Sequence, residues 1–300
     1  MVHGRKGNPL DPDLLQSIIG TVGCNAGQER SRNSRFQAPA ACNELFSMPA
    51  KHIWREGPQK PALPSERIDV WRLALDDSQL DKLSATLARE RTVLAPDELA
   101  RAARFHFEKD RIRFSRCRAA LRALLSRYLG LSPGDIRFTY SPSGKPEVSA
   151  DQNPHGVRFN VSHSESIALI AIGRCDNLGV DIEKVRRDVR AEELSERFFS
   201  TRERASLRAL PARLRVVAFY SCWARKEAFL KAIGEGLGFP LSDFSVSVHP
   251  DVEPRIEEIR GDATVGKRWS LVDLSAADSF RSALVIERPS TSVATFDLTA

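Results

Sequence analysis

The sequence has few of the residues that build disulfide-rich, zinc-binding or membrane proteins. Its 300 residues include five cysteines, an odd number, and no two of them stand at a metal-ligand spacing. It contains no run of about 18 apolar residues, the length that a membrane-spanning helix needs. Arg5 and Lys6 are not followed by the apolar segment of a secretory signal. These absences argue against a disulfide framework, a zinc site, a membrane span and secretion, and they favour a reducing, cytoplasmic setting.

The composition is that of an ordinary globular chain, with 42% hydrophobic and 28% charged residues. A chain of this length can bury one large core or two of moderate size. The formal net charge of +6 favours an anionic partner. A nucleic acid, a phosphorylated cofactor and an acidic protein all satisfy that condition, so charge alone does not choose among them.

A regular apolar pattern is absent from residues 1–65 and begins at residue 67. Residues 1–65 carry scattered Gly, Pro, Asn and Ser, so we expect a loose extension with at most a short helix at 12–19. A strand is predicted over 67–75, with a short helix after it. Apolar residues at steps of three and four then predict one long helix over 96–129, with Gly130 where a C-cap glycine belongs.

The remainder alternates short strands with helices. Strands are predicted at 136–140, 157–161, 167–172, 179–182, 244–248, 269–274 and 282–286, and helices at 194–199, 201–210 and 213–233. Because strands and helices do not alternate strictly, the pattern favours an α+β fold over a doubly wound sheet. The last residues, 291–300, are expected to be a loose tail.

Two carboxylates stand two residues apart in the segment Gly179–Glu183. Side chains alternate faces along a strand, so Asp181 and Glu183 share one face, roughly 7 Å apart, while Val180 and Ile182 face the core. Two carboxylates this close repel each other unless a cation lies between them. Hard oxygen ligands suit Mg²⁺, which also binds substrate phosphates. The alternative is a solvated polar face of an antiparallel sheet.

A second cluster lies in the predicted helix, where Glu227 and Lys231 are four residues apart and share a face. On its own this pair favours an ion pair on a solvated helix. His163 stands at the end of a predicted strand, where a histidine serves as a phosphate ligand, a general base or a surface residue. Lys145 lies in a turn and could meet a phosphate or only solvent.

The order of these segments resembles the 4′-phosphopantetheinyl transferase superfamily, in its long single-chain, Sfp-type branch. The family pattern is Gly-x-Asp-x-Glu on a strand, followed further along by Trp-x-x-Lys-Glu-Ala-x-x-Lys. Here these motifs are Gly179–Glu183 and Trp223–Lys231. The flanking segments that also match are Asn160–Ser164, Arg197–Ser200, Gly144–Pro146 and Gly234–Leu237. The resemblance covers about residues 67–288.

The resemblance implies a fold and an activity. The fold would be two similar α/β-layer halves related by a pseudo-twofold axis, at 66–176 and 177–290, with coenzyme A between them. The activity would be that of a holo-acyl-carrier-protein synthase, or 4′-phosphopantetheinyl transferase. Such an enzyme moves phosphopantetheine from coenzyme A to a serine of an apo acyl or peptidyl carrier protein. The partners would be coenzyme A and the carrier, with neither nucleic acid nor membrane, and the chain would act as a monomer.

The resemblance also implies roles for individual residues. Asp181, Glu183 and Glu227 would hold Mg²⁺, and Glu227, Lys231 and His163 would form the catalytic group. The contacts to coenzyme A would come from Arg101, Arg113, Lys145, Pro146, Ser162, His163, Lys226 and Lys231. One departure is Glu98, which stands where relatives often place a lysine for the 3′-phosphate.

Two other functions are compatible with part of the pattern. A homologue that has lost catalysis could bind coenzyme A as an interaction module. A nucleic-acid-binding protein would account for the positive charge and the arginine-rich segment 101–127, but it would leave the three carboxylates unexplained. Because 1–65 has no counterpart in the family pattern, we expect removal of residues 1–60 to leave activity largely unchanged.

Overall fold

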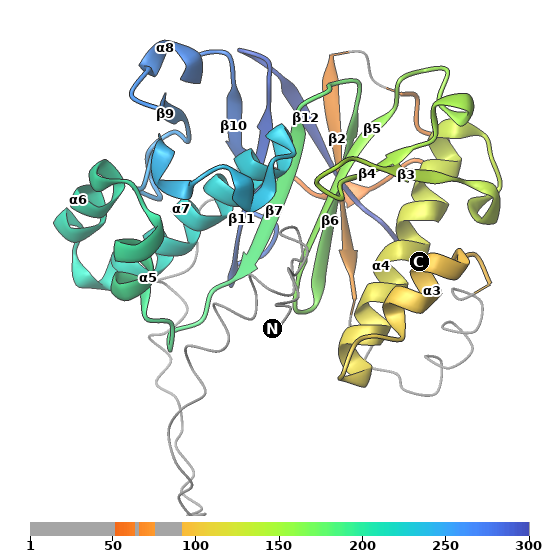
Figure 1. Cartoon of the computed structure of the whole chain (residues 1–300), viewed down its shortest axis with the longest axis horizontal. Helices are drawn as coiled ribbons and strands as arrows, with labels where there is room; N and C mark the ends of the chain where they lie inside the picture. The colour runs from red at the N-terminus through yellow and green to blue at the C-terminus, as the bar shows by residue number, and fades with distance from the viewer. Residues whose placement is uncertain (1–51, 64–65, 76–91, 300) are drawn as a thin grey trace, which may run out of the picture.

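A computed structural model describes residues 52–63, 66–75 and 92–299 as a mixed α/β protein. Two units, each a sheet covered by a long helix, lie side by side (Figure 1). The helix predicted at 12–19 and the short helix predicted after residue 75 lie outside the described residues. Within the described ranges, no helix is both long and apolar enough to cross a membrane.

The first unit is built on a five-stranded sheet of order β1-β12-β2-β6-β5. Its strands are β1 (Arg55–Glu56), β2 (Arg67–Ala74), β5 (Arg158–Ser164), β6 (Ile167–Gly173) and β12 (Ser292–Asp297). Beside it stand α3 (Pro96–Ala102) and the hairpin of β3 (Phe138–Tyr140) and β4 (Pro146–Val148). The helix α4 (Glu108–Leu129) covers the sheet, and Leu121 and Leu124 pack in one core with Trp71.

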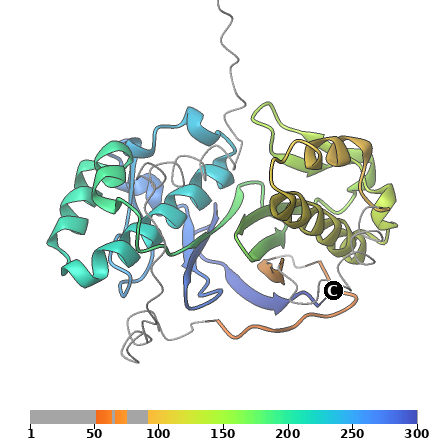
Figure 2. The same ribbon diagram turned by 90° about the horizontal axis from the view of Figure 1, so that it is seen from below.

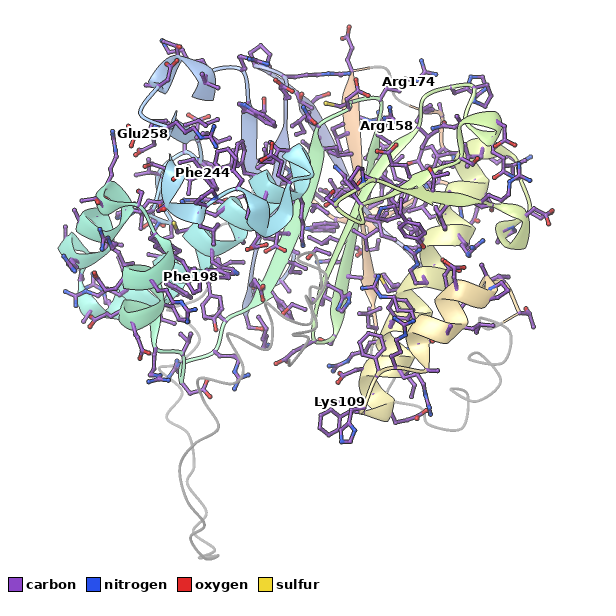
Figure 3. All side chains as sticks on the ribbon, viewed as in Figure 1. Lys109, Arg158, Arg174, Phe198, Phe244 and Glu258 are labelled. Atoms are coloured by element: carbon purple, nitrogen blue, oxygen red, sulfur yellow. The ribbon has the colours of Figure 1, made fainter. Side chains whose placement is uncertain are left out.

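The second unit has a three-stranded antiparallel sheet of order β10-β11-β7. Its strands are β7 (Leu178–Lys184), β10 (Ser270–Asp273) and β11 (Phe280–Ile286). The other elements are α5 (Ala191–Phe198), α6 (Thr201–Ala209), α7 (Ala212–Ile233), β8 (Phe244–Val246), β9 (Ile256–Ile259) and α8 (Ala263–Gly266). The fully buried α7 residues Phe219, Trp223 and Phe229 form an aromatic core, to which Phe198 and Phe244 contribute from neighbouring elements (Figure 3).

A third core joins the two units. Ile68 and Val70 of β2 and Leu169 of β6 pack with Val180 and Ile182 of β7. Because strand side chains alternate, each sheet places one set against its helix and the other set against the neighbouring sheet. The long helices therefore lie on the outer faces of the sheets, and β5 and β7 contact each other where the two units meet.

The glycine of the Gly-x-Asp-x-Glu motif lies where β7 approaches α7 most closely. A Cβ atom on Gly179 would stand 2.0 Å from the carbonyl oxygen of Ala228 and 2.4 Å from the nitrogen of Ala232. Such separations are impossible for any residue with a side chain, so glycine is required here. This close approach brings the carboxylates of β7 next to Glu227 of α7.

The predicted strands, and the helices between 194 and 233, are confirmed to within a few residues. The single long helix predicted at 96–129 is wrong, because the chain leaves α3 and starts again at α4. Phe107 has an extended backbone at the start of α4, and Phe105 packs on Phe114 with ring centroids 5.3 Å apart. This aromatic contact lies at the turn between α3 and α4. The apolar residues of the two helices follow the same helical spacing in the sequence, so the turn does not show in the pattern. Gly130 ends α4 in the left-handed conformation, with φ 72°.

Both ends of the described chain are more ordered than the sequence suggested. The predicted loose tail at 291–300 contains β12, which pairs in parallel with both β1 and β2. Residues 52–63 run along β12 on the side of the sheets away from the helices (Figure 2). Trp54 packs against the core between the sheets, and its Nε1 donates to the carbonyl of Ser275 at 3.3 Å. The expectation of a loose extension is therefore wrong for this segment.

Candidate active site

Three carboxylates meet where β7 passes under α7. Asp181 and Glu183 lie on the β7 face opposite to that of Val180 and Ile182, which are buried between the sheets. Glu227 reaches them from α7, and the charges of the three side chains influence one another. Asp181 and Glu227 are almost completely buried, with 3% and 5% of their surface exposed.

Lys231 lies one turn beyond Glu227 and points into this cluster. Its Nζ donates to Oδ1 of Asp181 at 2.6 Å and to Oγ of Ser162 at 2.8 Å. Ser162 in turn donates to the same oxygen of Asp181 at 2.9 Å. The sequence left open a simple ion pair between Glu227 and Lys231 on a solvated helix. The structure instead pairs Lys231 with Asp181, across the contact between helix and strand.

Burial dominates the protonation of the cluster. It raises the pKa of Glu227 to about 7, with a further contribution from the charge of Asp181. Burial, followed by the charge of Asp181, also holds the pKa of Glu183 well above its usual range. The pKa of Asp181 is raised by burial, against the opposing effect of Lys231. Carboxylates crowded in this way are stabilised in their charged form by a cation.

Two oxygen atoms of the cluster are buried without a hydrogen-bond partner among the residues that the structure describes. They are Oδ2 of Asp181 and Oε1 of Glu227. As the side chains stand, no group of three His, Cys, Asp or Glu residues in the described ranges is arranged to hold a metal ion. Lys231 supplies the positive charge that Asp181 contacts. The donor set of buried, unpartnered carboxylate oxygens nevertheless fits a hard divalent cation.

His163 lies among positively charged side chains beside the acidic cluster. Its imidazole is half-buried on β5, and its pKa falls to about 4. Burial is the largest cause, followed by the positive charges of Lys231, Arg113 and Arg101. These three cations come from α7, α4 and α3, so both units contribute to one positive region beside the carboxylates. A neutral histidine among cations and a nearby acidic cluster suit a polyphosphate bound with a metal ion.

The comparisons with known proteins agree with this arrangement. A sequence model described as 4′-phosphopantetheinyl transferase superfamily matches residues 177–285, and one described as 4′-phosphopantetheinyl transferase, N-terminal, matches residues 82–174. The 4′-phosphopantetheinyl transferase HetI of Nostoc sp. is 35% identical over 238 residues, which cover 79% of this chain and 94% of HetI. The chain belongs to the 4′-phosphopantetheinyl transferase superfamily.

Two other transferases support the same membership. The 4′-phosphopantetheinyl transferase Sfp of Bacillus subtilis is 34% identical over 164 residues, covering 55% of this chain and 70% of Sfp. The human L-aminoadipate-semialdehyde dehydrogenase-phosphopantetheinyl transferase is 28% identical over 209 residues, covering 65% of this chain and 68% of that protein. The resemblance found in the sequence motifs, including the Sfp-type branch, is thereby confirmed.

One predicted phosphate contact of this transferase does not fit the structure. Lys226 is fully buried, and its Nζ donates to both carboxylate oxygens of Glu203, at 2.7 and 2.8 Å, and to the carbonyl of Phe244 at 2.7 Å. Lys226 and Lys231 are five positions apart on the helix, so the two side chains leave α7 in different directions. Lys226 therefore stabilises the second unit of the transferase instead of facing the acidic cluster.

The hairpin between β3 and β4 places Lys145 at the end of α7. Its Nζ donates to the carbonyls of Lys231 at 2.8 Å, Leu178 at 3.0 Å and Ala232 at 3.4 Å. Burial lowers the pKa of this lysine to about 8. Lys145 thus caps the helix that carries Glu227, and Pro146 follows it as the first residue of β4. The ammonium group is already occupied by backbone carbonyls in this structure.

The departure at Glu98 has a structural explanation. Its side chain is buried on α3 and accepts from Nε of Arg118 at 2.9 Å and from Nε of Arg122 at 2.6 Å. It also accepts from the backbone nitrogen of Ala95 at 2.9 Å, which satisfies one free donor at the helix start. Glu98 therefore joins α3 to α4, and the 3′-phosphate contacts would have to come from other residues.

Sequence reasoning missed two groups that shape the site. Glu203 was not singled out, because nothing in the sequence links it to Lys226. The β5 side chains that face β7 were also missed as a set: Asn160 accepts from the nitrogen of Val180 at 2.8 Å, and Ser164 donates to Glu183 at 3.3 Å. Their signal was present in Asn160, Ser162 and Ser164, which are polar at every second position of a predicted strand.

Proposed function

We propose that this chain transfers the 4′-phosphopantetheine group from coenzyme A to a serine of an apo acyl or peptidyl carrier protein. In the transfer the serine hydroxyl gives up its proton to water and its oxygen bonds to the β-phosphorus. The bond to the leaving phosphate breaks, and adenosine 3′,5′-bisphosphate departs. The observation that carries the proposal is the joint placement of Asp181, Glu183, Glu227 and Lys231 beside His163. Membership of the superfamily, and the named activities of HetI and Sfp, support the same reaction.

The acidic cluster is proposed to hold Mg²⁺. Asp181, Glu183 and Glu227 would supply the ligands, and the unpartnered oxygens of Asp181 and Glu227 support that assignment. A bound Mg²⁺ would neutralise pyrophosphate charge and help to orient the phosphates. Lys231 would then exchange its bond to Asp181 for a contact to substrate phosphate. We assign Glu227 a ligand role, because a neighbouring cation lowers the pKa of a carboxylate and so weakens it as a base.

The positive region is proposed to bind the remaining phosphates of coenzyme A. Arg101 and Arg113 both lie within electrostatic reach of His163, and the three residues would hold the 3′-phosphate. Lys145 and Pro146 would border the adenosine end, with Lys145 acting through its support of α7. Phosphoryl transfer depends mainly on position and on charge stabilisation, and these residues provide both without a covalent enzyme intermediate.

We also propose that the two units, 66–176 and 177–290, are related by a pseudo-twofold axis. Each runs in the order strand, long helix, hairpin, strand pair, and the sheet orders β2-β6-β5 and β7-β11-β10 correspond. Both α4 and α7 have 22 residues and end at a glycine with φ 72°. Since one chain supplies both halves of the site, we propose a monomer. The free thiols of Cys117, Cys175 and Cys222 support a reducing, cytoplasmic location.

Intact-protein mass spectrometry tests the reaction directly. An apo carrier domain incubated with this chain, coenzyme A and Mg²⁺ should gain the mass of one phosphopantetheine group, and EDTA should abolish the gain. We expect Asp181→Asn and Glu227→Gln to lower turnover about 100-fold or more while the fold is kept. Normal transfer by either variant would contradict the metal assignment. Coenzyme A binding without transfer to any carrier class would favour the inactive binding module.

A further inference from the structure

Ser164 is the last residue of β5 and links that strand to the acidic cluster. Its Oγ donates to Oε2 of Glu183 at 3.3 Å and accepts from the backbone nitrogen of Lys184 at 3.1 Å. The side chain is almost fully buried, with 3% of its surface exposed. Its hydroxyl therefore serves two bonds at once, one to the strand β7 and one to a carboxylate on that strand.

Ser164 belongs to a row of polar residues that replaces a backbone ladder. In the part of the chain that the structure describes, β5 and β7 belong to different sheets and share no ladder. Asn160 accepts from the nitrogen of Val180, Ser162 donates to Asp181, and Ser164 donates to Glu183. Because these residues are two apart, one face of β5 fixes successive positions of β7. The first unit thus holds the acidic side chains of the second.

Glu183 depends on this row more than its neighbours do. Asp181 accepts from both Lys231 and Ser162, whereas among the described residues the side-chain hydrogen bond to Glu183 comes from Ser164. The charge of Lys231 and this hydrogen bond both favour the charged form of Glu183. The charges of Asp181 and Glu227 both disfavour that form. Since Ser164 occupies Oε2, the other oxygen of Glu183 is left for the cluster.

We propose that Ser164 is a positioning residue that orients Glu183 as a metal ligand. This inference rests on the proposed function, because it presupposes that Glu183 binds a divalent cation. Side chains that donate to a ligating carboxylate fix its orientation, and their loss weakens metal binding. The contact to Lys184 anchors the serine oxygen, so the side chain cannot move to a rotamer away from Glu183 without breaking a bond from the backbone.

Calorimetric titration of the full chain with MnCl₂ alone, without coenzyme A, tests the inference. We expect Ser164→Ala to weaken Mn²⁺ binding about tenfold or more. Ser164→Thr keeps the hydroxyl and should retain most of the affinity, whereas Ser164→Val has a similar shape without it and should behave like the alanine variant. In transfer assays, the loss should be larger in the KM for Mg²⁺ than in kcat at saturating Mg²⁺.

Ser282→Ala is the matched control. Ser282 is buried on β11 directly opposite Ile182, and its hydroxyl has no partner among the described residues. Its loss should leave Mn²⁺ affinity unchanged, and thermal melting checks that every variant is folded. If the original chain binds Mn²⁺ and transfers phosphopantetheine while Ser164→Ala and Ser164→Val match Ser282→Ala, the inference alone fails. If the original chain neither binds Mn²⁺ nor transfers, the proposed function fails and the inference with it.

Discussion

Two lysines of one motif have different tasks in this transferase. Lys226 pairs with Glu203 inside the second unit, and neither side chain is exposed. Lys231 pairs with Asp181 at the edge of the acidic cluster, where 22% of its side chain remains exposed. A fully buried ion pair is costly to break, because the remaining partner keeps a charge without compensation. A partly exposed pair can exchange one partner for another, as a bound substrate would require.

We therefore expect opposite outcomes from the same substitution at the two lysines. Lys226→Met should lower the free energy of unfolding by about 3–5 kcal/mol, because it leaves Glu203 buried without its partner. Lys231→Met should reduce transfer strongly and affect stability much less. Chemical denaturation together with transfer assays separates the two effects. The double variant Lys226→Met with Glu203→Gln should be more stable than Lys226→Met alone, because no charged carboxylate is left buried. If it is not, the loss of stability in Lys226→Met does not come from the unpaired charge of Glu203.

The pH dependence of His163 follows from its surroundings. Its pKa of about 4 lies below the ordinary value of 6.5, so the folded protein favours the neutral ring. This group therefore contributes stability above pH 6.5, and that contribution is lost as pH falls from 6.5 to 4. His163→Gln should flatten the stability profile in that window, as measured by denaturant unfolding.

A polyanion should reverse part of this shift. After burial, the positive charges of Lys231, Arg113 and Arg101 are the cause of the low pKa. Adenosine 3′,5′-bisphosphate would neutralise them, so we expect it to raise the pKa of His163 in a histidine NMR titration, with His163→Gln used to assign the signal. An unchanged titration in the presence of bound ligand would place the phosphates elsewhere.

Residues with a periodic signal could be predicted, and residues held by distant partners could not. Asp181 and Glu183 share a face because alternation along a strand requires it. The role of Lys226 depends on Glu203, and that of Lys145 on the end of α7, so neither follows from local pattern. The sequence motif places all of them in the site, whereas the contacts divide them between site and scaffold.

At the scale of elements, the acidic cluster depends on the close contact of β7 with α7. Gly179→Ala should force the two apart, because its Cβ would meet the backbone of Ala228 and Ala232. We expect a loss of about 3 kcal/mol in the free energy of unfolding, together with impaired transfer. Gly134→Ala is the control, because a Cβ there meets nothing within 4 Å. Equal thermal melting of the two variants would contradict the packing argument.

The spacing of apolar residues predicts that a helix is present better than it predicts where the helix ends. Helices α5, α6 and α7 of the second unit could be predicted because their apolar positions recur at helical spacing and their ends carry turn or cap residues. The single turn of α8 is too short to show such a period. The break between α3 and α4 was missed because Phe105 and Phe107 fit the same period, although Phe105 contacts Phe114 from outside the helix. A tertiary contact decided that boundary, and no local feature of the sequence marks it.

At the scale of the whole molecule, the segment before β2 is part of the structure. Trp54 packs against the core between the sheets and bonds to Ser275 of the second unit. We therefore expect removal of residues 1–60 to destabilise the protein, contrary to the expectation from the sequence. Trp54→Ala should lower the free energy of unfolding by about 1–2 kcal/mol. Ile53→Ser is the control, because 84% of Ile53 is exposed, and a similar loss there would point to a general effect of the segment.

The position of β12 between β1 and β2 also constrains how the protein is made. A ribosome produces β2 early and β12 only after the chain from Ala74 to Ser292, including every acidic residue of the site, has been synthesised. At typical elongation rates this interval is on the order of ten seconds or more. During that time the edge of β2 has no neighbour on one side. Completion of the first sheet is thus a late event in biosynthesis, and until β12 emerges the edge of β2 is open to pairing with other extended chains.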